Sequence, residues 1–313
     1  MNFSFSKSDE ALLHLGRALK ESGYSFITST PFTHARVNAR SENQTAKNLR
    51  DIFGWSRVFQ REILPTEIWD LINAAQIIET HENGLRSALR LSSLGGELFW
   101  HSAFPTSQSD AVFFGPDTYR YTSAIESLIA LKGSTPSRVV DIGAGSGAGA
   151  ILAARAFPNA EVFGVDINEA SLRLTRINAE LAKVKNVRAQ QSDLLNDVEG
   201  NFNLILANPP YLVDEDERAY RHGGGPLGAE LSLQIVDVAK ARLSVNGTLL
   251  LYTGAAIIEG RDPFREEVEA RLEGEFEYSY REMDPDVFGE ELENGVYRNA
   301  ERIAAVVLTM TKT

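Results

Sequence analysis

The chain of 313 residues contains no cysteine and only five histidines. The lack of cysteine excludes disulfide frameworks and thiolate chemistry, and it fits a reducing compartment. The histidines are scattered without the spacing of metal ligands, so we expect no metal site. No apolar signal core follows Met1, and no stretch approaches the ~18 apolar residues of a membrane span. Together these absences predict a cytoplasmic protein that does not cross a membrane.

Positive charge is also in short supply, because the formal net charge is −12. Residues 1–105 are balanced, with 11 basic and 11 acidic side chains, whereas residues 106–313 carry 20 basic against 32 acidic ones. An acidic region binds a phosphate backbone poorly, so a protein or small-molecule partner is favoured over RNA. One basic stretch stands apart, as a solvated helical face or as an anchor for nucleic acid: Arg36, Arg40, Lys47, Arg50, Arg57 and Arg61, opposed only by Glu42 and Asp51.

The first 105 residues predict three helices followed by a small β-ribbon. The helices are expected at 9–22, 42–54 and 64–75, and the strands at 76–80, 85–91 and 97–104. Asn83-Gly84 is a hairpin signal between the first two strands. This order is typical of a winged-helix-like module. Such modules serve in substrate recognition or packing as well as in nucleic-acid binding, so the fold leaves the role open.

From about residue 120 the pattern changes to strands that alternate with helices. Seven strands are predicted, at 138–142, 161–165, 187–190, 202–207, 248–252, 276–281 and 302–309. Helices are expected up to Ala156 after the first strand, and at 169–182, 230–243 and 264–272. This alternation predicts a doubly wound α/β sheet with ligands at the carboxyl ends of its strands. The last two strands have no long helix between them, so they are expected to pair antiparallel.

A glycine-rich turn, Asp141-Ile-Gly143-Ala144-Gly145-Ser-Gly147, follows the first of these strands. Glycine allows positive φ and a close approach of backbone to ligand, and the start of the next helix offers unpaired N–H groups to a carboxylate. Gly143, Gly145 and Ala148 also satisfy a relaxed dinucleotide fingerprint, and Asp166 lies near the distance of a ribose-binding acid. Asp166 could instead cap the helix after it. This turn alone therefore leaves a nicotinamide-binding domain as an alternative.

A second motif, Asn208-Pro209-Pro210-Tyr211, ends the predicted strand at 202–207. The Asn208 side-chain carbonyl and the Pro209 main-chain carbonyl can accept both hydrogens of a planar nitrogen, and so position it and stabilise charge that develops on it. Two successive prolines fix the backbone that carries these carbonyls. Tyr211 offers a flat face for a planar group. The structural alternative is a proline-rich turn with Tyr211 in the core.

In this order, about 65 residues apart, the two motifs resemble the class I S-adenosylmethionine (SAM) methyltransferases of the NPPY type, over roughly residues 105–311. The resemblance implies the class I methyltransferase sheet, SAM as cofactor, and a catalytic domain over 106–313 that follows a substrate-recognition domain over 1–105. Asp141 then orders the glycine loop and approaches the SAM amino group, while Asp193 contacts the adenine amine and Leu194 its ring. The remaining residues expected around the cofactor are Gly143, Ala144, Gly145, Gly147, Asp166, Ile167, Asn208 and Thr118.

Among NPPY enzymes, the plan of the chain is most similar to the release factor glutamine methyltransferases. Gly115-Pro116-Asp117-Thr118-Tyr119 stands where that family has Pro-Arg-Pro-Glu-Thr-Glu, and the segment is expected to lie over the SAM pocket. The loop after Tyr211 holds four acids, at 214–217, and a His222-Gly-Gly-Gly stretch that could act as a lid, with His222 as an exposed loop residue.

These features predict a SAM-dependent N-methyltransferase that acts on a planar amide or exocyclic amine. A protein glutamine side chain is the leading acceptor, and a small molecule or an RNA base amine (adenine N6 or guanine N2) remains open. A SAM-binding module without turnover is the alternative from another class.

Overall fold

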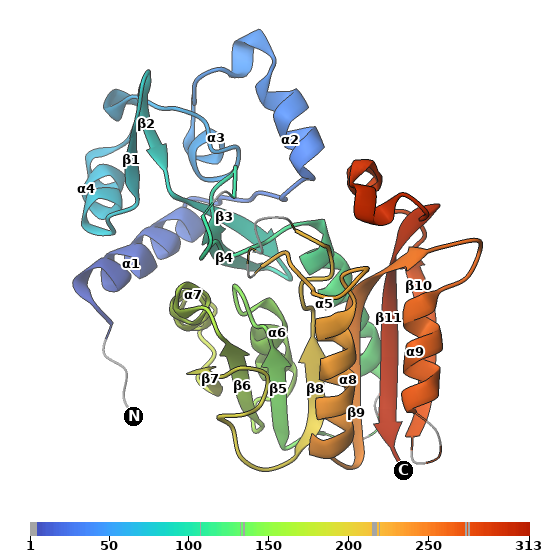
Figure 1. Cartoon of the computed structure of the whole chain (residues 1–313). Coiled ribbons are helices and arrows are strands. Elements are labelled where there is room, and N and C mark those ends of the chain that lie inside the picture. Colours follow the sequence, from blue (N-terminus) through green and yellow to red (C-terminus); the bar gives the residue numbers. More distant parts are fainter. Residues whose placement is uncertain are drawn as a thin grey trace.

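A computed structural model describes residues 5–106, 108–131, 133, 135–214, 218, 220–272, 274 and 276–313. Its centre is a seven-stranded sheet in the order β10-β11-β9-β8-β5-β6-β7 (Figure 1). The strands are β5 (Arg138–Ile142), β6 (Glu161–Asp166), β7 (Val187–Gln191), β8 (Phe202–Ala207), β9 (Leu243–Ile257), β10 (Phe276–Asp284) and β11 (Arg302–Lys312). β5 to β9 run parallel, and β11 pairs antiparallel with both β9 and β10. The predicted doubly wound sheet and its antiparallel end are confirmed.

Helices cover both faces of this sheet, which explains the apolar runs in its strands. In β8, Phe202, Ile205 and Ala207 face the core under α8 (Glu230–Arg242) and α9 (Pro263–Arg271). Leu204 and Leu206 face the opposite core under α5 (Pro116–Leu131) and α6 (Ala148–Ala156). α7 (Glu169–Leu181) lies beside β6 and β7. In the part of the chain that the structure describes, no helix is long and apolar enough to span a bilayer.

The N-terminal elements lie above this sheet in Figure 1. They are α1 (Lys7–Glu21), α2 (Pro31–Asn38), α3 (Leu49–Phe53), α4 (Thr66–Ala74) and two antiparallel hairpins, β1 (Ile78–His81) with β2 (Gly84–Ser87) and β3 (Leu89–Leu94) with β4 (Glu97–Ser102). The predicted helices at 9–22 and 64–75 and the turn at Asn83-Gly84 are confirmed. The single strand predicted at 85–91 is instead two strands, because the Ala88 N–H donates to the Ile77 carbonyl and the chain changes partner there.

The predicted helix at 42–54 is wrong over most of its length. Only a 3₁₀ turn at Ser41–Asn43 and the short α3 are helical. Between them the chain is extended, with Thr45 bridged to Val58, and Asn48 begins α3 by accepting a hydrogen bond from the Asp51 N–H. The basic stretch is therefore not one helical face. Arg57 is buried and pairs with Asp51 at 2.6 Å, which removes both charges from the surface.

The N-terminal elements share a core with α7. Leu12, Leu15 and Leu19 of α1 pack in one cluster with Leu174, Ile177 and Leu181 of α7. At Gly16 the two helices come so close that a Cβ would lie 2.9 Å from a methyl carbon of Leu181. The buried Asn178 side chain joins α7 to β4 and to the glycine-rich turn: it accepts from the Trp100 N–H at 2.8 Å, and donates to the carbonyls of Trp100 at 3.0 Å and Ser146 at 2.9 Å.

Replacing Asn178 with alanine should lower the free energy of unfolding by about 2–4 kcal/mol, because three buried main-chain groups lose a partner. Urea denaturation measures the change. Arg17→Ala is the control, at the neighbouring contact between α1 and α7. It removes only an ion pair with Glu180 between half-exposed side chains, which is worth at most about 1 kcal/mol. Equal losses in the two variants would contradict this interpretation of the contact.

Candidate active site

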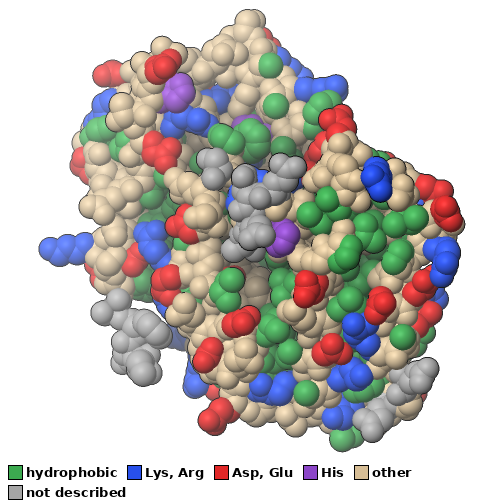
Figure 2. Space-filling model, in the orientation of Figure 1, with side chains coloured by type: hydrophobic (Ala, Val, Ile, Leu, Met, Phe, Trp, Pro, Cys, Tyr) green, Lys and Arg blue, Asp and Glu red, His purple; other side chains and the backbone are tan. Residues whose placement is uncertain are grey.

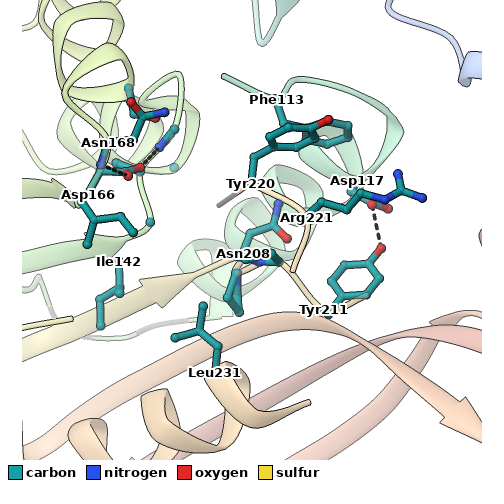
Figure 3. A pocket seen from close by; sticks show the side chains of 18 of the residues that line it. Phe113, Asp117, Ile142, Asp166, Asn168, Asn208, Tyr211, Tyr220, Arg221 and Leu231 are labelled. Carbon is teal, nitrogen blue, oxygen red and sulfur yellow. Dashed lines mark hydrogen bonds between the residues drawn. The ribbon is translucent and has the colours of Figure 1, made fainter. Parts of the chain in front are cut away.

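A cavity opens at the carboxyl ends of β5, β6 and β8 (Figure 3). Most residues that the sequence singled out line it: Thr118, Gly143, Ala144, Gly145, Asp166, Ile167, Asp193, Leu194, Asn208, Pro209, Pro210 and Tyr211. They come from five separate segments of the chain, which only the fold brings together. Two candidates, Asp141 and Gly147, do not line the cavity. Gly147 begins α6 with a φ of 83°, which explains glycine at that position.

Asp166 connects the glycine loop to the second strand. One of its carboxylate oxygens accepts the Gly145 N–H and the other accepts the Asn168 N–H, both at 2.9 Å (Figure 3). Burial raises the pKa of Asp166, against the effect of these bonds. Asn168 is the N-cap of α7 and accepts a hydrogen bond from the Ala170 N–H. The alternative role of Asp166, as the cap of this helix, is therefore filled by Asn168. Asp166 is therefore available to a ligand in the cavity.

Asp141 lies behind the loop rather than on the cavity wall. Its carboxylate accepts the Tyr121 hydroxyl at 2.6 Å and the Ala150 N–H at 2.8 Å. Burial raises the pKa of Asp141 to about 7. Both partners belong to helices, α5 and α6, so Asp141 joins these helices behind the loop, and its ordering of the loop and its approach to the SAM amino group stay predictions. The lining position belongs to Tyr121, which the sequence did not single out.

The Asn208–Tyr211 segment supplies the opposite wall. Asn208 is half-buried, and its carboxamide has no hydrogen-bond partner among the residues that the structure describes. The ring of Tyr211 lies against the backbone of β9, where a Cβ on Gly254 would be 2.2 Å from its Cδ2. The Tyr211 hydroxyl donates to Asp117 at 2.6 Å (Figure 3). The side chain of Tyr211 is therefore fixed, and Asn208 is free to bind.

The loop after Tyr211 packs under this motif. The Gly223 N–H donates to the Leu212 carbonyl at 2.8 Å, and a Cβ on Gly223 would lie 2.7 Å from the Pro210 oxygen. His222 is half-buried rather than exposed, and its Nδ1 accepts the Asp214 N–H at 3.2 Å. Residues 222–223 therefore pack against the Asn208–Tyr211 segment and the residues that follow it, instead of forming a free lid.

Of the four acidic residues at 214–217, which the sequence places beside the expected site, only Asp214 falls among the described residues. It is buried and pairs with Arg218 and Arg221, and the hydrogen bond from Arg218 is the main cause that lowers its pKa.

Several lining residues were missed. Asp117, Phe113, Tyr220, Arg221 and Phe288 all face the cavity. Tyr220 also donates its hydroxyl to the Thr106 carbonyl at 2.6 Å. Tyr119, by contrast, accepts the Thr28 N–H and does not line the cavity. Asp117 had a signal, since it stands in the segment identified before the first strand, but the helix that buries it was not predicted.

The sequence of the chain is similar to those of known methyltransferases. Residues 127–257 match the methyltransferase small domain family. A Methanocaldococcus jannaschii protein named "Putative protein N5-glutamine methyltransferase" is 31% identical over 173 residues, which cover 50% of this chain and 87% of that protein. The chain belongs to the NPPY-type, SAM-dependent methyltransferases.

A release factor glutamine methyltransferase of Deinococcus radiodurans is 34% identical over 172 residues, or 51% of this chain and 60% of that protein. One from Rhodopirellula baltica is 33% identical over 145 residues, or 41% and 49% of the two chains. The chain thus spans about half to three fifths of the length of these two relatives. A solved tRNA methyltransferase of M. jannaschii is 18% identical, with a TM-score of 0.49 over 73% of this chain and 60% of that one.

For this NPPY-type methyltransferase, Asp166→Ala should weaken SAM binding by about 1.5–3 kcal/mol, or roughly 10- to 100-fold, because a charge-assisted hydrogen bond is lost. Calorimetry with SAM and S-adenosylhomocysteine measures this. Asp237→Ala, at an exposed carboxylate on α8, is the control and should bind like the wild type. An unchanged affinity in Asp166→Ala would remove this residue from the cofactor site.

Proposed function

We propose that the chain transfers a methyl group from SAM to a planar amide nitrogen, with a protein glutamine side chain as the leading acceptor. The observation that carries the proposal is the carboxamide of Asn208, for which the described part of the chain offers no hydrogen-bond partner. It faces the same cavity as the glycine loop (Figure 3). The names of the three glutamine methyltransferase relatives support an amide of glutamine as the acceptor.

The described residues fit the cofactor. Gly143 and Gly145 have φ values of 68° and 56°, and so bring bare backbone to the cavity wall. The Asp166 carboxylate suits ribose hydroxyls, and exposed Asp193 suits an adenine amine. Leu194 and the exposed Ile167 add apolar surface for the ring. When bound there, SAM supplies an electrophilic methyl group.

The chain's own contribution is to orient and polarise the acceptor. The lone pair of an amide nitrogen is delocalised, so this nitrogen is a poor nucleophile. The Asn208 Oδ1 and the Pro209 carbonyl oxygen can accept its two hydrogens, which holds the lone pair toward the methyl group and stabilises the positive charge that develops on nitrogen. The proton becomes acidic once the new N–C bond forms, so it can leave to solvent without a strong base. The ring of Tyr211 borders this site and provides an apolar face.

We propose that residues 1–105 recognise the acceptor and that residues 106–313 carry the chemistry. Two contacts join these parts and support this division of labour: the Thr28 N–H donates to the Tyr119 hydroxyl at 3.1 Å, and the Asn178 side chain of α7 bonds to the main chain of Trp100. A protein acceptor is favoured over RNA. On the face in Figure 2, basic and acidic side chains are interspersed, and Arg57 of the basic stretch is neutralised by Asp51.

The experiment is transfer of tritium from labelled SAM into cell extract, separated into protein, RNA and small-molecule fractions. The expected label is in protein, as methylated glutamine after total digestion, and its rate of incorporation falls by roughly 10²–10³ with Asn208→Ala. Label in RNA would overturn the acceptor class. In that case RNA affinity should fall by several powers of ten between ~50 and ~200 mM salt if six or more phosphates are contacted. SAM binding without transfer to any fraction would indicate a regulatory module instead.

A further inference from the structure

Asp117 is a buried carboxylate that the chemistry above does not use. It lies in the first turn of α5 and is 4% exposed. Its two oxygens accept the Tyr211 hydroxyl at 2.6 Å and the Tyr252 hydroxyl at 2.7 Å, and Arg120 lies 3.2 Å away. Burial raises the pKa of Asp117, and the two tyrosines and Arg120 act against that rise. A buried carboxylate with this many donors is held in one position.

The bond to Tyr211 reaches the acceptor side of the cavity. Three contacts hold the ring of Tyr211. Asp117 accepts its hydroxyl, and the backbone at Gly254 lies against its Cδ2 and Cε2. Phe288 packs against it at a steep angle, with the two ring centroids 5.9 Å apart. Pro209 and Pro210 connect this ring to Asn208 through backbone of fixed φ. A displacement of the ring that shifts the Tyr211 backbone would therefore also move the Pro209 carbonyl and the Asn208 side chain.

Asp117 also joins segments that are far apart in sequence. Tyr252 belongs to β9, and Arg120 pairs in turn with Asp284 at the end of β10, at 2.8 Å. One carboxylate thus links α5, the NPPY motif and the antiparallel end of the sheet. The Tyr211 hydroxyl donates to the buried Asp117 and so points away from the cavity. The acceptor therefore meets the ring of Tyr211 and not its hydroxyl.

We infer that Asp117 is a positioning residue for the methyl acceptor: it fixes Tyr211 and, through it, the two carbonyl acceptors at Asn208 and Pro209. The inference deepens the proposed function and rests on it for its kinetic consequence. The geometric consequence, that Tyr211 is held by Asp117, can be measured without any acceptor.

The kinetic test is Asp117→Asn. The amide keeps the volume but offers an N–H₂ group in place of one oxygen, so only one tyrosine keeps its acceptor. We expect kcat to fall about tenfold with SAM affinity within twofold of wild type. Tyr211→Phe breaks the same bond from the other side, so the double variant should be no worse than either single one. Losses that multiply in the double variant would mean that the two residues act separately.

Tyr280→Phe is the matched control. Its hydroxyl makes a 2.6 Å bond to Asp262, so it has the same chemistry, but it lies outside the cavity lining. It should leave kcat unchanged. If Tyr280→Phe and Asp117→Asn lower kcat and the unfolding midpoint equally, the role of Asp117 is general stability and the inference fails.

The second readout is ¹⁹F NMR of protein labelled with 3-fluorotyrosine, which reports on nine tyrosines. The Tyr211 signal is identified by its absence in Tyr211→Phe. In Asp117→Asn it should shift and broaden, while in Tyr280→Phe it should not. An unchanged Tyr211 signal would overturn the inference. A changed signal in a protein that methylates nothing would leave Asp117 as the residue that positions Tyr211 and reject the proposed function alone.

Discussion

Asn208→Ala should lower kcat by roughly 10²–10³ and leave SAM affinity near the wild-type value. The expected loss is that of one preorganised polar group which acts on charge developing in the transition state. In the structure the Asn208 carboxamide has no hydrogen-bond partner among the described residues, so its removal should not disturb the protein's own contacts. Steady-state methyl transfer and calorimetry with SAM measure the two quantities.

Two further variants test whether the position of the Asn208 carboxamide matters as well as its presence. Asn208→Gln keeps the carbonyl but moves it by one methylene, and should also be slow. Asn83→Ala, at the exposed β1–β2 turn, should match the wild type. Methyl transfer by Asn208→Ala at the wild-type rate would show that the carboxamide does not orient the acceptor.

Gly254→Ala should reduce turnover by about 10² or more, although Gly254 does not line the cavity. A Cβ there would lie 2.2 Å from the Cδ2 and 2.4 Å from the Cε2 of Tyr211, a separation that real Cβ atoms do not adopt. The methyl group must therefore push the Tyr211 ring off β9, and the NPPY backbone with it. The glycine loop lies on the other wall, so SAM affinity should change by less than about tenfold.

The control is Gly289→Ala, since no heavy atom lies within 4 Å of a Cβ built there. Both glycines have ordinary φ, so the two substitutions differ only in the space around them. Urea denaturation tests whether Gly254→Ala is folded. Wild-type turnover in a folded Gly254→Ala would mean that the position of the Tyr211 ring does not control the acceptor site.

The sequence predicted the central strands well because they are buried on both faces. β5 and β8 were predicted with the observed bounds, since apolar runs such as Phe202–Ala207 end sharply at polar or proline residues. The helices α2 and α5 were missed. α2 is only eight residues long and buries only His34, and the buried face of α5 includes the polar Asp117, Thr118 and Thr122, so neither shows a clear apolar stripe. The helix at 42–54 failed because tertiary pairing of Ala46 with Val58 outcompeted local propensity.

The same distinction holds for the site. Asp166 and Asn208 could be predicted because a local motif carries their chemistry, and both face the cavity. The bond between Asp117 and Tyr211 joins residues 94 positions apart and depends on a helix that the sequence did not reveal. The prediction of Tyr211 as a flat face is compatible with the structure, but the commitment of its hydroxyl could come only from the tertiary fold.

The shared core of α1 and α7 has a mechanical consequence. α7 begins three residues after Asp166, so the helix that carries the N-terminal elements starts at the cofactor wall. The N-terminal elements and the cofactor wall are thus connected through one helix. A molecule bound to those elements is thereby held at a set distance from the methyl donor.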